Sequence, residues 1–200
     1  MVKQIKIGII GIQGAISEHA NIMQKTLKKN KKPGKVIIIR DKNQINDIDG
    51  LLIPGGESTT ISNFLIKNGM YDEILNRINE NNIAIMGTCA GCVLLAKKII
   101  KTRNNNCLLK AIDMKVIRNA FGGQRQSFEK KIDIKGFKKP YNAFFIRAPI
   151  IKEVWSDCKI LAKVDNKIVM VRQNNFLALS FHPELTEDTR IHEYFLDMIN

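Results

Sequence analysis

Continuous apolar runs alternate with amphipathic stretches in the first half of the chain. The apolar runs, which predict buried strands, cover residues 5–12, 36–40, 49–53 and 83–86. Apolar residues with helical spacing predict helices over about 15–29, 58–68 and 72–81. Uninterrupted apolar runs are typical of strands covered on both faces, and strands that alternate with helices form parallel sheets. This pattern predicts an α/β fold, a three-layer, flavodoxin-like sandwich with a mostly parallel central sheet between helices.

The second half of the chain has shorter segments with β character, which predict additional antiparallel strands. These segments cover residues 108–109, 114–117, 128–134, 142–146, 160–163, 168–172 and 176–180. The sequence Asp165-Asn166-Lys167 predicts a hairpin turn, and a last helix is expected over about 187–199. A chain of 200 residues without an internal repeat, a linker or a low-complexity segment predicts one domain that covers residues 1–200.

The apolar pattern breaks sharply at Gly87-Thr88-Cys89-Ala90-Gly91 and resumes in a stretch that is expected to be helical to about residue 97. Glycines on both sides of one nucleophile let the backbone turn abruptly from a strand into a helix and leave the central side chain accessible. The spacing is the thiol counterpart of the serine-hydrolase elbow. A thiol in the first turn of a helix lies near the positive end of the helix dipole, which favours the nucleophilic thiolate. Cys89 is therefore the candidate nucleophile.

Two other interpretations of Cys89 stay open on this local pattern. A free cysteine at a strand–helix junction is often a small buried apolar residue. Cys89 and Cys92 also have the two-residue spacing of redox dithiols. Cys92, however, shares an apolar helical face with Val93 and Ala96, which favours packing over redox chemistry.

A second candidate element is the loop at residues 54–60, with the sequence Pro-Gly-Gly-Glu-Ser-Thr-Thr. Gly55 and Gly56 allow a close backbone approach, and the hydroxyl residues after them suit the cap of the following helix. In a parallel sheet this loop and the elbow both follow the carboxyl ends of strands, where ligands bind. A backbone N–H from the loop and that of Ala90 are therefore expected to hold an oxyanion. The alternative is a turn and helix cap with no further role.

A base for the nucleophile is predicted where the segment 176–180 runs into His182-Pro183-Glu184. Alternate residues of an extended chain face the same way, so Glu184 can bond to one ring nitrogen of His182 while the other faces Cys89. Taken alone, His182 fits a structural histidine equally well. Together the three residues form a nucleophile, a base and an orienting acid.

The charge of the chain narrows the class of partner. The net charge is +13, from 32 Lys and Arg against 19 Asp and Glu, which first suggests an acidic partner. The lysines form short scattered clusters without interleaved aromatic residues or a groove-binding motif. We therefore expect no nucleic-acid partner.

Cysteine and histidine usage bears on location. Four cysteines and three histidines lack the spacing of a disulfide framework or a metal cluster, and fit a reducing cytoplasm. No apolar run approaches the roughly 20 residues of a membrane span, so no membrane association is expected. The N-terminal apolar run is interrupted by Gly8 and Gly11, which favours a first strand over a signal peptide. His19 and His192 lie in amphipathic stretches and are expected to be surface or packing residues.

Taken together, the motifs resemble those of class I, triad-type glutamine amidotransferases, and within them the glutaminase subunits of pyridoxal 5′-phosphate synthase. The resemblance spans almost the whole chain and is carried by residues 11–15, 52–60, 87–91, 127–129, 145–149 and 180–186. The elbow and the His-Pro-Glu sequence are shared by the wider superfamily. The segments Gly-Ile-Gln-Gly-Ala (11–15), Glu-Ser-Thr-Thr (57–60) and Phe-Ile-Arg-Ala-Pro (145–149) point to this subfamily.

The resemblance implies a glutaminase in which Cys89 attacks the side-chain amide of L-glutamine, His182 transfers protons and Glu184 orients His182. Ammonia leaves, and a thioester is hydrolysed without a cofactor or a metal. The resemblance also implies glutamine-binding or oxyanion-hole roles for Gly55, Gly56, Glu57, Ala90, Arg118, Ile146 and Arg147. One departure lies at Phe121-Gly122-Gly123-Gln124, where the family tends to have arginine in place of Gly123. The role of that arginine is in doubt here, although Arg125 follows two residues later.

The charged residues of this set suit a free amino acid. Arg118 or Arg147 can bind the α-carboxylate through paired donors, while Glu57 can receive the α-ammonium. A thiol hydrolase of the same fold that acts on γ-glutamyl or peptide bonds remains the alternative. A basic binding protein with a vestigial site is disfavoured, because the nucleophile, base and acid are all present.

Ammonia released by a glutaminase needs a destination. The resemblance implies a separate barrel-shaped synthase subunit of the PdxS or SNZ type, in a large hetero-oligomer on a dodecameric core. The segment 11–15 ends the first strand at the same sheet edge as Gly56 and Cys89. Contacts made there by Gln13 are therefore expected to reach the oxyanion-hole loop.

Overall fold

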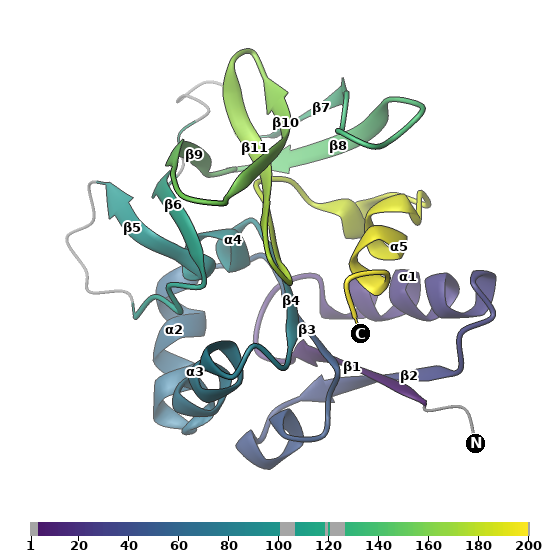
Figure 1. Cartoon of the computed structure of the whole chain (residues 1–200), viewed down its shortest axis with the longest axis vertical. Helices are drawn as coiled ribbons and strands as arrows, with labels where there is room; N and C mark the ends of the chain where they lie inside the picture. The colour runs from purple at the N-terminus through teal and green to yellow at the C-terminus, as the bar shows by residue number, and fades with distance from the viewer. Residues whose placement is uncertain (1–3, 101–106, 119, 121–126, 200) are drawn as a thin grey trace.

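The computed structural model describes residues 4–100, 107–118, 120 and 127–199, and Figure 1 shows a central sheet with helices on both sides. Within these residues, the parallel part of the sheet has the strand order β2-β1-β3-β4-β12. The bounds are β1 Ile5–Ile10, β2 Gly34–Ile39, β3 Gly50–Ile53, β4 Ala84–Thr88 and β12 Phe176–Leu179. Every residue of β3, β4 and β12 is buried, as continuous apolar runs between two helical layers predict.

Helices cover both faces of this sheet (Figure 1). One face carries α1 (Ile16–Lys29) and α5 (Arg190–Leu196), and the other carries α2 (Ser58–Lys67), α3 (Met70–Asn79) and α4 (Ala90–Leu95). Each face has its own apolar cluster. The first contains Met23 and Phe195, and the second contains Leu65 and Ile74. The predicted three-layer α/β architecture is confirmed.

Beyond β12 the sheet continues with mostly antiparallel strands in the order β11-β9-β6-β5, and β10 pairs with β11. The bounds are β5 Ala96–Ile100, β6 Ile112–Ile117, β9 Ile150–Val154, β10 Lys159–Val164 and β11 Lys167–Gln173. A separate hairpin contains β7 (Ser127–Ile132) and β8 (Tyr141–Ile146). The β10–β11 hairpin turns at Asp165 and Asn166, whose φ angles of 47° and 62° fit a type I′ turn at the predicted place.

Two helices are shorter than predicted. The helix after the elbow ends at Leu95 rather than near residue 97, because β5 begins at Ala96 and pairs in parallel with β6. The last helix begins at Arg190 rather than near residue 187, because a 3₁₀ turn, η2 (Pro183–Leu185), and a bend precede it. Another 3₁₀ turn, η1 (Lys42–Ile45), was not predicted.

Besides β5, which was not predicted, strand predictions failed at two places. Residues 108–109 form no strand, and the N–H of Leu109 instead donates to the carbonyl of Leu94, 2.7 Å away in α4. β9 was not predicted, because its two isoleucines are followed by Lys152 and Glu153, which gives no strand period. Its pairing with β6 and β11 makes it a strand. Long-range partners, rather than the local pattern, decide both segments.

Candidate active site

Cys89 lies between β4 and α4, with a φ of 48° and a ψ of −99°. A positive φ is rare for a residue with a side chain. The elbow forms because its flanking residues lack Cβ atoms: a Cβ on Gly87 would lie 2.6 Å from the carbonyl of Gly91, and one on Gly91 would lie 2.1 Å from the oxygen of Ile53. The N–H of Cys89 donates to the Leu179 carbonyl at 2.8 Å, which ties the turn to β12. The thiol is thereby presented to a cavity.

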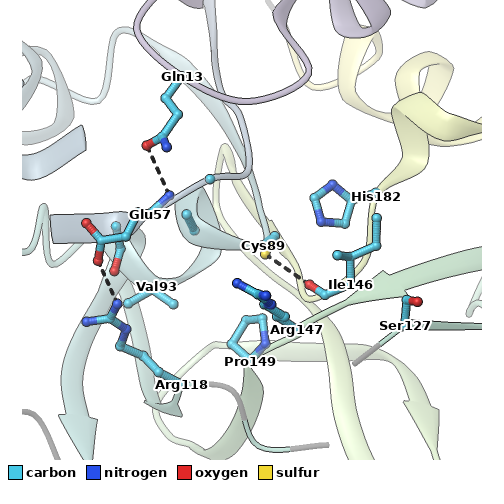
Figure 2. Close-up of a pocket in the computed structure, with 13 residues that line it drawn as sticks. Gln13, Glu57, Cys89, Val93, Arg118, Ser127, Ile146, Arg147, Pro149 and His182 are labelled. Carbon is cyan, nitrogen blue, oxygen red and sulfur yellow. Dashed lines mark hydrogen bonds and ion pairs between the residues drawn. The ribbon is translucent and has the colours of Figure 1, made fainter. Parts of the chain in front are cut away.

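His182 lies beside the elbow (Figure 2), and Glu184 lies behind it. Nδ1 of His182 is 2.7 Å from Oε1 of Glu184, in hydrogen-bond geometry. Nε2 is the nitrogen left for Cys89, and it has no hydrogen-bond partner within the described residues. Sγ of Cys89 instead lies 3.8 Å from the carbonyl oxygen of Ile146 (Figure 2). A Cβ on Gly55 would lie 2.5 Å from the His182 ring and 3.4 Å from Cβ of Cys89, so this glycine lets the ring lie next to the thiol.

Opposite charges stabilise the pair of His182 and Glu184. Burial lowers the pKa of His182, but Cys89 and Glu184 outweigh burial and raise the pKa to about 10. Burial raises the pKa of Glu184, but His19 and His182 outweigh it and hold the pKa below its ordinary value. At neutral pH the pair is therefore an imidazolium and a carboxylate, so a positive charge lies next to the sulfur of Cys89. α4 has only six residues, so its dipole is smaller than that of the longer helix predicted from the sequence.

An open cavity of about 580 Å³ lies in front of Cys89 and His182 (Figure 2). Its lining includes most of the other residues predicted for the site: Gly56, Glu57, Ala90, Arg118, Ile146 and Arg147. Gly55 and Glu184 do not line it and lie against the His182 ring. The lining also includes residues that the sequence analysis did not assign to the site: Gln13, Ser58, Val93, Ser127 and Pro149. A signal existed for all of these except Val93, since Gln13, Ser58, Ser127 and Pro149 fall in segments that carry the family resemblance.

Glu57 and Arg118 bond to each other in the cavity wall, with 2.8 Å between Oε1 and Nη2 (Figure 2). The same carboxylate caps α2, because it accepts hydrogen bonds from the backbone and hydroxyl groups of Thr59 and Thr60. Partial burial raises the pKa of Glu57, but the hydrogen bonds from Thr59 and Thr60 outweigh it and lower the pKa to about 2. A ligand would therefore meet a preformed ion pair rather than the two separate charges expected from the sequence.

The loop at Gly55 and Gly56 rests on the segment that follows β1. The carbonyl oxygen of Gly55 lies 2.1 Å from the place that a Cβ on Gly14 would take, and Gly14 has a φ of 96°. Oε1 of Gln13 accepts a hydrogen bond from the N–H of Glu57 at 3.2 Å (Figure 2). Because a trans peptide is planar, the direction of the Gly55 carbonyl fixes that of the Gly56 N–H. Gln13 and Gly14 therefore set the orientation of an amide predicted for the oxyanion hole.

Two further histidines lie fully buried behind the site. Nε2 of His19 is 3.2 Å from Oε2 of Glu184 and 3.2 Å from Oγ1 of Thr88. The ring of His192 packs against that of His19, with 5.8 Å between the centroids. A surface position is thus wrong for both, and packing describes His192. No local pattern indicated that His19 reaches Glu184, because the two residues lie near opposite ends of the sequence.

Cys92 is fully buried among apolar residues, and burial raises the pKa of its thiol. All four cysteines of the chain are free. A thiol without solvent access is a poor redox partner, so packing explains Cys92 better than a dithiol does. The described residues contain no group of three or more His, Cys, Asp or Glu side chains placed to hold a metal.

The segment Phe121-Gly122-Gly123-Gln124, where the sequence departs from the family pattern, and the nearby Arg125 lie outside the described residues. None of the described helices has both the length and the apolar content that crossing a membrane requires.

An α/β sheet with a thiol on a strand–helix elbow, next to a histidine–carboxylate pair, is the architecture of thiol-dependent hydrolases. The chain belongs to the SNO glutamine amidotransferase family, whose model matches residues 9–200. It is 46% identical over 196 residues to the pyridoxal 5′-phosphate synthase subunit PdxT of Pyrococcus furiosus, a match that covers 98% of this chain and 99% of the relative. The subunit PdxT of Archaeoglobus fulgidus is 46% identical over 198 residues, with 97% and 98% covered.

Solved structures agree with this assignment. A crystal structure of a glutamine amidotransferase superimposes with a TM-score of 0.86 and 38% identity, and covers 96% of this chain and 98% of its own. A glutamine amidotransferase from Thermotoga maritima has a TM-score of 0.61 over 98% of this chain and 84% of its own. At 12% identity, the second match shows the fold alone.

Proposed function

We propose that this chain is the glutaminase subunit of a pyridoxal 5′-phosphate synthase and hydrolyses L-glutamine to L-glutamate and ammonia. The family is one of glutamine amidotransferases, and the relatives that match almost the whole chain are named as synthase subunits. The structural observation that carries the proposal is the charged pair of His182 and Glu184 beside the elbow thiol of Cys89.

In the proposed reaction Cys89 is the nucleophile, His182 the base and Glu184 the orienting acid. The sulfur leaves the Ile146 carbonyl and attacks the side-chain amide carbon of glutamine, while His182 holds the thiol proton. The C–N bond then breaks, and His182 gives its proton to the departing ammonia. Water attacks the thioester, His182 takes a proton from the water and returns it to the sulfur, and glutamate leaves.

Backbone amides and charged side chains complete the proposed site. The N–H groups of Ala90 and Gly56 are the proposed donors to the oxyanion that forms in both steps. In the Glu57–Arg118 pair, the guanidinium suits the α-carboxylate of glutamine and the carboxylate suits its α-ammonium. Further contacts with the substrate are assigned to Ile146 and Arg147, which line the cavity. Gly55 was also predicted to bind glutamine, but it lies against the His182 ring outside the cavity lining, so its proposed part is to shape the oxyanion-hole loop.

The proposed destination of the ammonia is a barrel-shaped synthase subunit of the PdxS or SNZ type, in a cytoplasmic hetero-oligomer with a dodecameric core. Support comes from the place of Gln13 and Gly14, which are exposed and also contact the loop at residues 55–57. A partner that binds this surface would reach the oxyanion-hole loop directly.

A thiol hydrolase of γ-glutamyl or peptide bonds is the second candidate, because the cavity is open and larger than one amino acid needs. Release of glutamate from L-glutamine and from γ-glutamyl dipeptides, with the synthase subunit present, separates the two. We expect glutamine to be the better substrate. Faster release from the dipeptides would overturn the proposed function.

Variants of the two neighbouring cysteines complete this experiment. Cys89→Ala is expected to lower kcat by several powers of ten, as loss of a nucleophile does. Cys92→Ala is expected to keep kcat within about threefold, at some loss of stability from the cavity it leaves. Activity that disappears only in Cys92→Ala would revive the dithiol interpretation.

A further inference from the structure

A second group of polar side chains lies behind the pair of His182 and Glu184, and none of its members lines the cavity. His19 comes from α1, Thr88 ends β4, and Glu184 belongs to η2. Nε2 of His19 lies 3.2 Å from Oγ1 of Thr88 and 3.2 Å from Oε2 of Glu184, and all three residues are buried. One ring nitrogen thus contacts the residue before Cys89 and the acid that bonds to the base.

These contacts define the protonation state of His19. Burial lowers the pKa of His19 and outweighs the opposing effect of the Glu184 charge, so the ring is neutral at neutral pH. A neutral imidazole carries one proton, and a bare nitrogen lone pair would repel the carboxylate oxygen that faces it. The proton therefore lies on Nε2, from which it is donated to Thr88 and stabilises the negative charge of Glu184.

Glu184 needs such a neighbour. Its Oε1 is engaged by His182, whereas Oε2 is buried and has no well-aligned hydrogen bond within the described part of the chain. A buried carboxylate oxygen without a donor is destabilised, and rotation of the side chain toward a better donor would pull Oε1 away from His182. The Nε2–H dipole of His19 opposes that rotation, because it stabilises Oε2 in its present place.

We propose that His19 is a positioning residue for glutamine hydrolysis: it holds Glu184, and through Glu184 also His182, in the orientation that the reaction uses. The inference rests on the proposed function, in which His182 is the base and Glu184 orients it. His19 does not touch the substrate cavity. It acts through Glu184 and Thr88, and so joins α1 to the catalytic residues.

Substitutions can separate positioning from packing. His19→Leu removes the donor but keeps much of the side-chain volume. His19→Gln places an amide nitrogen at the same number of bonds from the backbone as Nε2, whereas the amide nitrogen of His19→Asn is one bond short. His192→Leu is the matched control, because His192 is equally buried, packs on His19 and has a ring that makes no hydrogen bond within the described residues.

The readouts are kcat, KM and the pH profile of glutamine hydrolysis by the full chain with the synthase subunit present. His19→Leu is expected to lower kcat about 10- to 100-fold, the size of effect seen when a partner that orients a metal ligand is removed, and to leave KM within about threefold. The alkaline limb of kcat/KM should also move to lower pH, because Glu184 would hold the His182 proton less firmly. His19→Gln should recover most of the kcat, and His192→Leu should stay within about threefold of the wild type.

Equal kcat values for His19→Leu and His192→Leu would overturn the inference. Where His19→Leu does not fold, the comparison of His19→Gln with His19→Asn decides, and equal kcat values in these two would likewise overturn it. A wild-type chain that does not hydrolyse glutamine would overturn the proposed function, and this inference with it. If the wild type is active and Cys89→Ala is inactive, the proposed function stands, and a failed His19 comparison then counts against the positioning role of His19 alone.

Discussion

The charge on His182 decides what the thiol of Cys89 can do. A histidine with an ordinary pKa near 6.5 is mostly neutral at neutral pH and must remove the thiol proton during the reaction. Here Cys89 and Glu184 outweigh burial and raise the pKa of His182 to about 10, so the ring holds a proton before substrate arrives. The site therefore stores its leaving-group proton in advance. The same single residue sets the upper pH limit of the reaction.

The substitution Glu184→Gln tests this charge. In the wild type the proton on His182 is lost only as the pH rises through about 10, so activity should persist to that region. Glutamine has the same shape but no charge, so the pKa of His182 falls back toward 6.5 and the alkaline limb of kcat/KM moves to lower pH. The profile should be measured from neutral pH to about pH 11. An unchanged alkaline limb would show that Glu184 does not hold the imidazolium.

At the scale of elements, the approach of one turn to another determines the proposed oxyanion hole. The turn between β1 and α1 presents Gly14 to the carbonyl of Gly55, and this contact leaves no room for a side chain. The elbow uses the same device, because Gly91 packs against the carbonyl of Ile53. Both catalytic loops are thus shaped by backbone-to-backbone contacts at the carboxyl edge of the parallel strands.

Gly14→Ala is therefore expected to disturb catalysis. Its Cβ would lie 2.1 Å from the Gly55 oxygen, so the peptide must move and the Gly56 N–H would turn from its place. Loss of one oxyanion donor lowers kcat about 10²- to 10³-fold, and we expect an effect of at least about tenfold. Gly136→Ala is the control, because Gly136 has a similar φ of 91° but nothing lies within 4 Å of its Cβ position. Similar kcat values for the two folded variants would contradict this account of the loop.

The sequence predicted most strands and the three catalytic residues, but it did not predict which distant side chains contact each other. The parallel strands were predicted because each is an apolar run that needs no particular neighbour, and Cys89, His182 and Glu184 stood out because each follows a strand. β5 and β9 were missed because pairing with β6 makes them strands. The bonds from Glu57 to Arg118 and from His19 to Glu184 join residues far apart in sequence, and no local period encodes which side chains will meet.

At the scale of the whole molecule, α1 connects the proposed docking surface to the rest of the protein. The turn before it contacts the loop at residues 55–57, and His19, the fourth residue of the helix, contacts Glu184. In its last turn, Nζ of Lys29 lies 2.6 Å from Oε1 of Glu193 on α5, which lies beside α1 in Figure 1. A partner that binds at the start of α1 and shifts this helix would therefore affect both the proposed oxyanion hole and Glu184.

We accordingly expect the isolated chain to hydrolyse glutamine weakly and the synthase subunit to raise the rate. Gln13→Ala should reduce that stimulation several-fold and change the basal rate less, because Gln13 is exposed and bonds to the Glu57 N–H. Glu18→Ala should act in the same direction. Gln24→Ala, which removes an exposed glutamine elsewhere on α1, is the control. The test is the glutaminase rate of each variant with and without the synthase subunit. Equal wild-type rates in both conditions would contradict the activation but not the assignment of the catalytic residues.

The preformed pair of Glu57 and Arg118 also bears on which metabolites the site accepts. In its proposed role, the pair binds both charged groups of glutamine at once: Arg118 binds the α-carboxylate and Glu57 binds the α-ammonium. Each charged group therefore keeps a counter-ion when the substrate separates the pair. A glutamine analogue without its amino group, or one without its α-carboxylate, would separate the pair and leave one member without a counter-ion. The site would then select its ligand by the presence of both charges, a dipole matched to a dipole, and would exclude the many cellular amines and acids that carry only one.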